Sequence, residues 1–172
     1  MKITNKTTVQ DACLMLEVAD FLEEIKKVHT PVDIPELTYG QRIDLSEAQN
    51  VKDILFLPMK ILKGIEEPEV LGLPFLEVWN LSVSVFEELQ RIAKRDAATF
   101  KYNPSPEEIE AGYMELNHGI FGTVDQIAQR LNIPHDEVFS LPEKRVYAML
   151  KIDFENSMYQ KRLQKVYQGN KV

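Results

Sequence analysis

Cysteine is nearly missing from this chain, which has a single one, Cys13, among 172 residues. One cysteine cannot close an internal disulfide, so nothing in the composition points to an oxidising compartment. The N-terminus lacks the apolar core of a signal peptide, and no apolar run approaches the roughly 20 residues that cross a bilayer. The longest, from Ile54 to Met59, is far shorter. The sequence therefore predicts a soluble cytosolic protein with no membrane partner.

The motifs of common catalytic and metal sites are also missing. The sequence has no glycine-rich phosphate loop, no Gly-x-Ser-x-Gly elbow and no His-Glu-x-x-His. Its histidines, His29, His118 and His135, are isolated from one another, whereas zinc sites carry paired ligands at short spacing. The pair Glu115-x-x-His118 occurs once, although di-iron bundles use it twice. We predict no catalytic residue, no metal and no cofactor, and Cys13, on an apolar helix face, is predicted to be a buried thiol.

Positive charge is scarce as well, with 20 basic against 27 acidic residues and a net charge of −7. Up to Ile133 there are 13 basic against 22 acidic residues, a balance of −9. From Pro134 onward the balance reverses to +2, with 7 basic against 5 acidic residues. A duplex-binding surface needs several Lys or Arg to displace counterions from phosphates. The sequence therefore argues against a nucleic-acid partner, except for a small opening at the C-terminal end.

Helix signals, by contrast, occur along most of the chain. Caps and apolar periodicity agree in predicting an all-α bundle of about six to seven helices. Pro31, Pro35 and Gly40 punctuate alternating residues, which predicts an extended arm or short hairpin near residues 30–45. We expect an N-terminal helical region with this arm at 1–102 and a C-terminal helical module at 103–172, and we leave their packing as one domain open. The predicted helices are residues 8–27, a stretch opened by Ser46 and interrupted by Pro58, 74–99, 105–118, 123–132 and 140–168.

Part of the helical pattern recurs within the chain. Residues 69–91 align with 137–159 at an offset of 68, with seven identities in 23 positions. In both copies a short helix leads through Leu-Pro into a long amphipathic helix. The echo is consistent with a duplicated helix–Leu-Pro–helix module and equally with a helical corner that reuses residues for local geometric reasons.

Residues 123–146 also resemble a helix-turn-helix, which supplies an alternative function as a DNA-binding transcription regulator. Ala128 would lie where the two helices pack closely, Asn132 in the turn and Val138 as an anchor. However, the second helix would begin with Asp136 and Glu137, where groove-reading helices place basic or amide side chains. The charge of the exposed face of 134–146 distinguishes the two functions.

The last helix becomes basic and aromatic towards its end. After Glu155 it carries cations and no acid, with Tyr159 and Tyr167 between them. One interpretation is a projecting arm that docks on an acidic protein, with Arg162 and Lys165 as its charges. The other is a helix whose basic end complements its own dipole.

Two stretches together resemble small helical proteins of tailed-bacteriophage gene clusters, especially tail assembly chaperones. The first is Glu36-Leu-Thr-Tyr-Gly-Gln-Arg-Ile-Asp-Leu45, and the second begins Glu137-Val-x-x-Leu-Pro142 and ends Tyr159-Gln-Lys-Arg-Leu163. The resemblance implies a non-enzymatic binder of tail, neck or tape-measure subunits in the host cell cytoplasm, with incorporation into the virion and homo-oligomer formation left open. The predicted protein interface comprises Tyr39, Gly40, Ile43, Leu45, Tyr159, Arg162, Lys165 and Tyr167.

Overall fold

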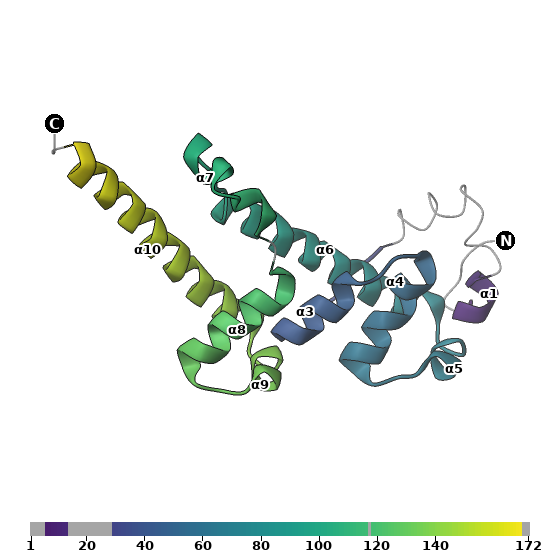
Figure 1. Ribbon diagram of the computed structural model, residues 1–172. Coiled ribbons are helices and arrows are strands. Elements are labelled where there is room, and N and C mark those ends of the chain that lie inside the picture. The colour runs from purple at the N-terminus through teal and green to yellow at the C-terminus, as the bar shows by residue number, and fades with distance from the viewer. Residues whose placement is uncertain (1–5, 14–28, 117, 170–172) are drawn as a thin grey trace. The chain divides into compact units, whose positions relative to one another are not determined.

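The computed structural model describes residues 6–13, 29–116 and 118–169 (Figure 1). These residues form helices and no β-strand, which confirms the all-α prediction. None of the helices described is both long and apolar enough to span a membrane. In chain order the elements are α1 (Val9–Cys13), α3 (Tyr39–Ser46), α4 (Val51–Pro58), the π-helical turn η1 (Met59–Lys63), α5 (Glu67–Val70), α6 (Phe75–Thr99), α7 (Pro106–Glu110), the 3-10 turn η2 (Tyr113–Glu115), α8 (Gly119–Leu131), α9 (His135–Phe139) and α10 (Glu143–Gly169).

The helices belong to two units of the chain. The first unit comprises Met1–Leu37 and Gln41–Ala93, and the second comprises Thr38–Gly40 and Lys94–Val172. The sequence placed a boundary between residues 102 and 103, which falls inside the second unit. The short segment Thr38–Gly40 belongs to the second unit although the residues on both sides of it belong to the first.

Local chemistry explains where several helices begin and end. Asn50 caps α4 by accepting a hydrogen bond from the backbone N–H of Asp53, at 2.9 Å. Pro58, at the end of α4, has no N–H to donate, and the chain continues into the π-helical turn η1, as the predicted interruption at Pro58 requires. Ser105 and Glu108 form the predicted capping box of α7. The long helix predicted at 74–99 is confirmed as α6.

Other predicted elements differ from the structure. The predicted arm or hairpin is wrong for residues 39–46, which form α3, whereas residues 29–37 form no helix or strand. Both prolines of this region precede residue 36, so none interrupts α3, and Gly40 sits in its first turn. Ser46 ends α3 rather than opening a helix, and Thr123 lies inside α8, which begins four residues earlier.

The helices predicted at 105–118 and 8–27 are each seen only in part among the described residues. The helix predicted at 105–118 ends at Glu110, because Gly112 adopts a left-handed conformation (φ 85°) that an α-helix cannot continue through. Of the helix predicted at 8–27, Val9–Cys13 is helical and residues 14–28 lie outside the described part of the chain. The side chain of Cys13 likewise lies outside it. The described helices outnumber the six or seven predicted, since one-turn helices such as α5 and α9 precede the long ones.

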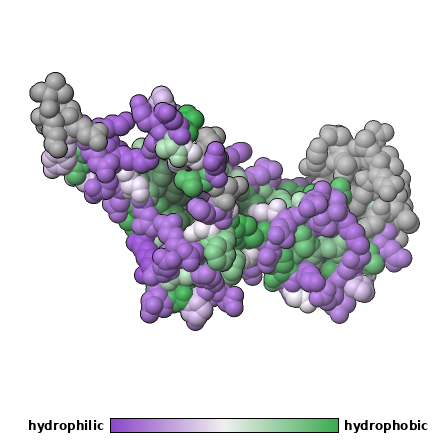
Figure 2. Space-filling view, in the orientation of Figure 1, coloured by the Kyte–Doolittle hydropathy of each residue, from purple (hydrophilic) through white to green (hydrophobic). Residues whose placement is uncertain are grey.

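Each unit has apolar side chains buried in its interior. The first unit has one cluster, centred on α4 and α6, which also includes Leu37 and Leu45 from the segment before α4. Burial of these side chains away from water is the main stabilising contribution to the unit. The buried apolar side chains of the second unit are Tyr39, Val124, Ile127, Ala128, Val138, Val146 and Met149. Polar side chains dominate the visible surface, with apolar ones between them (Figure 2).

The two units repeat one helical corner at the offset of 68 residues found in the sequence. Val51 begins α4 and Gly119 begins α8, and both first helices end at a left-handed residue, Gly64 (φ 67°) and Asn132 (φ 54°). Val70 and Val138, in α5 and α9, are both fully buried. The correspondence thus extends over the whole corner, well upstream of the Leu-Pro step.

A short extended segment docks on each corner in the same way. The N–H of Val9 donates to the carbonyl of Leu73 at 3.0 Å, and the N–H of Tyr39 donates to the carbonyl of Leu141 at 2.8 Å. Each donor also begins a helix, α1 or α3. The isolated β-bridges Thr8–Pro74 and Thr38–Pro142 accompany these bonds. Thr38–Gly40 therefore completes the second corner as Thr8–Val9 completes the first.

Candidate protein-binding groove

Each corner leads into a long helix, α6 in the first unit and α10 in the second. The two corners bury different kinds of side chain where these helices begin. In the first unit, Phe75 stacks on Trp79 with ring centroids 5.9 Å apart. The corresponding residues of the second unit are Glu143 and Tyr147, 68 positions later. Glu143 is buried (3% exposed) and binds Arg95, whose guanidinium lies over the Tyr147 ring at 3.6 Å. A charged cluster thus replaces an aromatic stack.

The Arg95 cluster ties the C-terminal end of α6 to α10. Arg95 Nη2 donates to Glu143 at 2.5 Å and to Asp96 at 2.7 Å. Burial alone would lower the pKa of Arg95, but the hydrogen bonds to Glu143 and Asp96 outweigh it and the pKa is raised. Thr99 and Tyr147 share a further hydrogen bond of 2.9 Å between their hydroxyls. The α6 end is therefore held firmly on the first half of α10.

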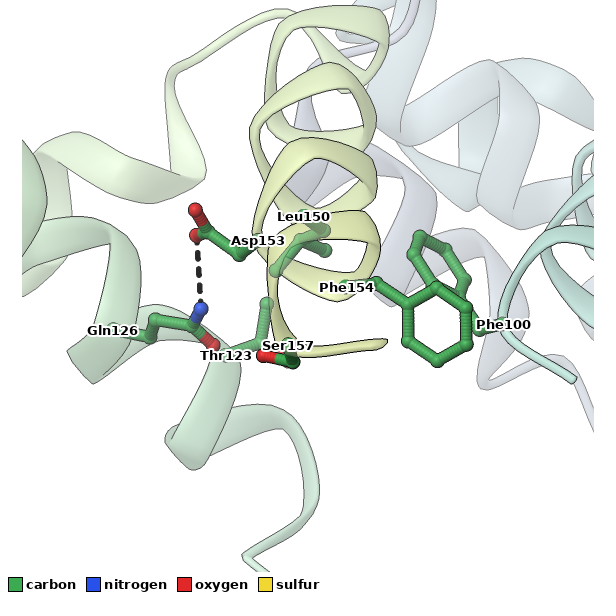
Figure 3. Close-up of a pocket in the computed structure, with 7 residues that line it drawn as sticks. All are labelled: Phe100, Thr123, Gln126, Leu150, Asp153, Phe154 and Ser157. Atoms are coloured by element: carbon green, nitrogen blue, oxygen red, sulfur yellow. Dashed lines mark hydrogen bonds between the residues drawn. The ribbon is translucent and has the colours of Figure 1, made fainter. Parts of the chain in front are cut away.

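Beyond this cluster a groove of about 370 Å³ opens between α8, α10 and the end of α6. Phe100 packs edge-on against Phe154, with centroids 5.7 Å apart, and forms one apolar side (Figure 3). The opposite side is polar, because Gln126 of α8 donates to Asp153 of α10 at 2.9 Å (Figure 3). The residues that line the groove are Phe100, Thr123, Gln126, Leu150, Asp153, Phe154 and Ser157.

At three of the seven matching positions the first unit has a buried apolar side chain. Leu55 and Val85, which correspond to Thr123 and Asp153, are fully buried. Pro58, which corresponds to Gln126, is buried too. The cluster that encloses these helices includes Leu37 (4% exposed) and Leu45 (0%) from the preceding segment.

The matching face of α10 lacks such a cover along its second half. Val146 and Met149 are buried, but Leu150, Asp153 and Phe154 are partly exposed and Ser157 is exposed. The side-chain exposure of Asp153 is 30%. The two related faces therefore differ at three positions, where the first unit buries Leu55, Pro58 and Val85 and the second unit has the polar, at least partly exposed Thr123, Gln126 and Asp153.

The structure places the predicted N-terminal interface residues in the chain's own packing. Tyr39 is 7% exposed and its ring stacks on Phe139, with centroids 6.5 Å apart. A Cβ at Gly40 would lie 3.0 Å from the Cβ of Phe139, so only glycine allows this approach without adjustment. Leu45 is fully buried and Ile43 is half-buried.

The predicted C-terminal interface residues all lie on the second half of α10 and are exposed. Tyr159 is 53% and Tyr167 63% exposed. Arg162 and Lys165, exposed as well, line a second hollow of about 600 Å³ beside α7. These exposed side chains of α10 are therefore separate from Tyr39 and Gly40, which pack against Phe139 in the corner. The predicted interface residues do not form one site.

A polar cluster beside this hollow joins α7 to α10. Lys161 donates to the carboxylate of Glu108 and to the hydroxyl of Tyr102, each at 2.7 Å. The Tyr102 hydroxyl also donates to the Glu108 carboxylate. The backbone N–H of Ser105 donates to the same carboxylate at 2.9 Å. The bond from Lys161, then those from Tyr102 and Ser105, lower the pKa of Glu108 from 4.5 to about 2.

This depressed pKa predicts a loosening of α7 in acid. Because the folded pKa lies below the ordinary value, ionised Glu108 stabilises the fold above pH 4.5, and this contribution is lost as pH falls towards about 2. A carbon-detected NMR titration of the Glu108 carboxyl should give a midpoint near 2, and Lys161→Ala should raise it. A midpoint near 4.5 in the unmodified chain would show that the cluster does not persist in solution.

The helix-turn-helix geometry considered for residues 123–146 is present as α8 and α9. Ala128 is buried between them, and Asn132 forms the left-handed turn. The exposed residues of 134–146 include two acids, Asp136 and Glu137, and two bases, Lys144 and Arg145. This balance gives no positive face for phosphates. DNA binding by this corner stays a prediction that the charge does not favour.

Within the described residues, no group of three or more His, Cys, Asp or Glu side chains could hold a metal ion. Comparison with known proteins found no match: no family model, curated protein or solved structure is significantly similar to this chain. The inference of function therefore depends on the geometry described above.

Sequence reasoning missed the groove, although a signal for it was present. Aligning the two copies at the offset of 68 sets Leu55, Pro58 and Val85 against polar residues. Where two copies of one helical corner differ by polar residues in place of apolar ones, the polar copy is expected to expose that face to solvent. The identities alone, which were the basis of the sequence comparison, did not reveal this difference.

Proposed function

We propose that this protein is a non-enzymatic, protein-binding component of phage-type assembly, either a tail assembly chaperone or a virion-associated subunit. The observation that carries the proposal is the open groove of the second unit, which has polar, at least partly exposed side chains at three positions where the first unit buries Leu55, Pro58 and Val85. A groove with an apolar floor that stays open beside a completed corner is suited to receive a segment from another protein.

The chemistry of the groove supports reversible binding. Leu150 and Phe154 supply an apolar floor, while Thr123, Gln126 and Ser157 keep its walls hydrated when nothing is bound. An amphipathic helix that lays its apolar face into such a groove is a common mode of peptide recognition. Asp153 is already paired within the chain, with Arg130 at 2.7 Å and Gln126 at 2.9 Å, so the polar side of the groove presents no unpaired charge to a partner.

The resemblance of residues 36–45 and 137–163 to phage morphogenesis proteins supports the class of partner. We propose tail, neck or tape-measure subunits as the partners, bound in the host cell cytoplasm, with incorporation into the virion only if the protein is a virion-associated subunit. No catalytic residue takes part in this activity.

Affinity capture of the tagged full chain from cells that express its native gene cluster, with nuclease added, tests the proposal. We expect stoichiometric recovery of a tail, neck or tape-measure subunit. Ser157→Trp, which places an indole in the groove at an exposed position, should reduce recovery at least tenfold, or about 1.4 kcal/mol. Lys151→Trp, at an exposed position of α10 that does not line the groove, is the matched control.

The possible results separate the functions clearly. Recovery of a structural subunit that Ser157→Trp abolishes and Lys151→Trp preserves would support the groove as the binding site. Recovery that neither substitution changes would contradict this site. Recovery of proteins only when nuclease is omitted would show that they are held through DNA. That result would contradict the assembly role and favour the helix-turn-helix regulator.

A further inference from the structure

The outer side of α10 carries apolar side chains that its own unit does not cover. Ile152, Tyr159 and Val166 are 47%, 53% and 58% exposed. They follow one another at intervals of seven residues, which is nearly two helical turns, so they form a stripe along one side of the helix. Leu163, three residues before Val166, is half-buried on the same side.

This stripe lies on the side of α10 opposite its internal contacts. Val146 is buried and Leu150 and Phe154 face the groove. At about 100° per residue, the direction of Ile152 and Tyr159 is roughly half a turn away from that of Leu150 and Phe154. An apolar row repeating every seven residues on a free helix face is the pattern that a second helix covers.

The charges beside the stripe indicate which helix fits it. Glu155 flanks its first half and Arg162 flanks its second half, both exposed. Within the chain, Glu155 lies 3.8 Å from Lys151, and both remain largely in solvent. An antiparallel copy of α10 sets Glu155 beside Arg162 of the other chain on the same side of the seam, whereas a parallel two-fold pair places these residues on opposite sides of the seam and forms no such ion pair.

We propose that α10 pairs with α10 of a second copy, antiparallel and centred on Tyr159. In this register Ile152 of one copy meets Val166 of the other, and the two Tyr159 side chains meet at the two-fold axis. The contact is isologous, so it closes as a dimer and does not extend into a filament. This inference goes beyond the proposed function, because it uses the outer face of α10 and leaves the groove open in both copies.

The paired stretch, Ile152 to Val166, is about 21 Å long at 1.5 Å per residue. A contact between two single helices over this length is small, and interfaces below about 1,200 Å² are typically weak, so we expect a reversible dimer with a dissociation constant on the order of micromolar. Sedimentation equilibrium of the full chain from about 1 to about 200 µM brackets that value.

Substitutions test the register of the dimer. Glu155→Lys and Arg162→Glu should each weaken dimerisation about tenfold, because each sets like charges together across the interface, and the double variant should regain most of the affinity. Val166→Lys should give a monomer throughout. These positions are exposed, so the helical circular dichroism of each variant should match that of the unmodified chain.

Disulfide formation tests the axis. In a Cys13→Ser background, Tyr159→Cys should form a disulfide-linked dimer on mild oxidation, since only facing side chains bring two Cα atoms within about 7 Å. Gln160→Cys, exposed on the next position but off the stripe, is the matched control and should cross-link at least tenfold more slowly.

Three results would overturn the proposal. The first is a monomer across the whole concentration range, and the second is equal cross-linking through positions 159 and 160. The third is a double variant, Glu155→Lys with Arg162→Glu, that dimerises no more tightly than the single variants. None of them bears on capture of a partner by the groove, which Ser157→Trp reports and the α10 substitutions do not.

Discussion

Replacing Arg95 by alanine is expected to destabilise the second unit by about 3 to 5 kcal/mol. The substitution leaves the carboxylate of Glu143, 3% exposed, without the guanidinium that binds it at 2.5 Å and 3.2 Å. It also removes the planar group that lies over the Tyr147 ring. Removing the cation from a buried ion pair is among the costliest defects that one substitution can create. Urea unfolding followed by NMR resonances of α8 and α10 measures the loss.

The related corner of the first unit supplies the control. There, an aromatic side chain, Phe75, occupies the position of Glu143. The double variant Arg95→Leu, Glu143→Phe should therefore recover most of the lost stability, because apolar groups of similar volume replace a buried ion pair with little cost. A double variant as unstable as Arg95→Ala would contradict the equivalence of the two corners at this position.

Replacing Tyr39 by alanine should destabilise the second unit by about 3 kcal/mol or more. Tyr39 is 7% exposed, stacks on Phe139 and donates its N–H to Leu141. Its removal leaves a cavity at the corner and loosens the only segment from before residue 94 that belongs to this unit. The resonances of α9 and the first turns of α10 should report the loss at lower urea than those of α4.

Tyr167→Ala is the matched control, because Tyr167 is 63% exposed on α10 and its truncation removes little burial. Its effect should stay within about 0.5 kcal/mol. If Tyr39→Ala also changed the free energy of unfolding by less than about 0.5 kcal/mol, Thr38–Gly40 would not stabilise the second unit. The docking of Thr38–Tyr39, which resembles that of Thr8–Val9, would then contribute nothing to stability.

Local signals were sufficient where neighbouring residues decide the structure. The capping box of Ser105 and Glu108 and the apolar periodicity of residues 75–99 predicted α7 and α6, because a cap needs only the next turn of the chain. They failed at residues 39–46, where Gly40 suggested a break. Its tight approach to Phe139 is a contact between segments 99 residues apart, which no local pattern contains.

The sequence by itself determined that this chain is helical, that its net charge is acidic, and that one helical corner recurs after 68 residues. Those properties follow from composition and periodicity, which short stretches carry in full. Only the tertiary structure decided that Tyr39 and Leu45 are used inside the chain, and that α8, α10 and the end of α6 leave a groove open between them. The physical reason is that exposure depends on what covers a side chain, and the cover comes from segments distant in sequence.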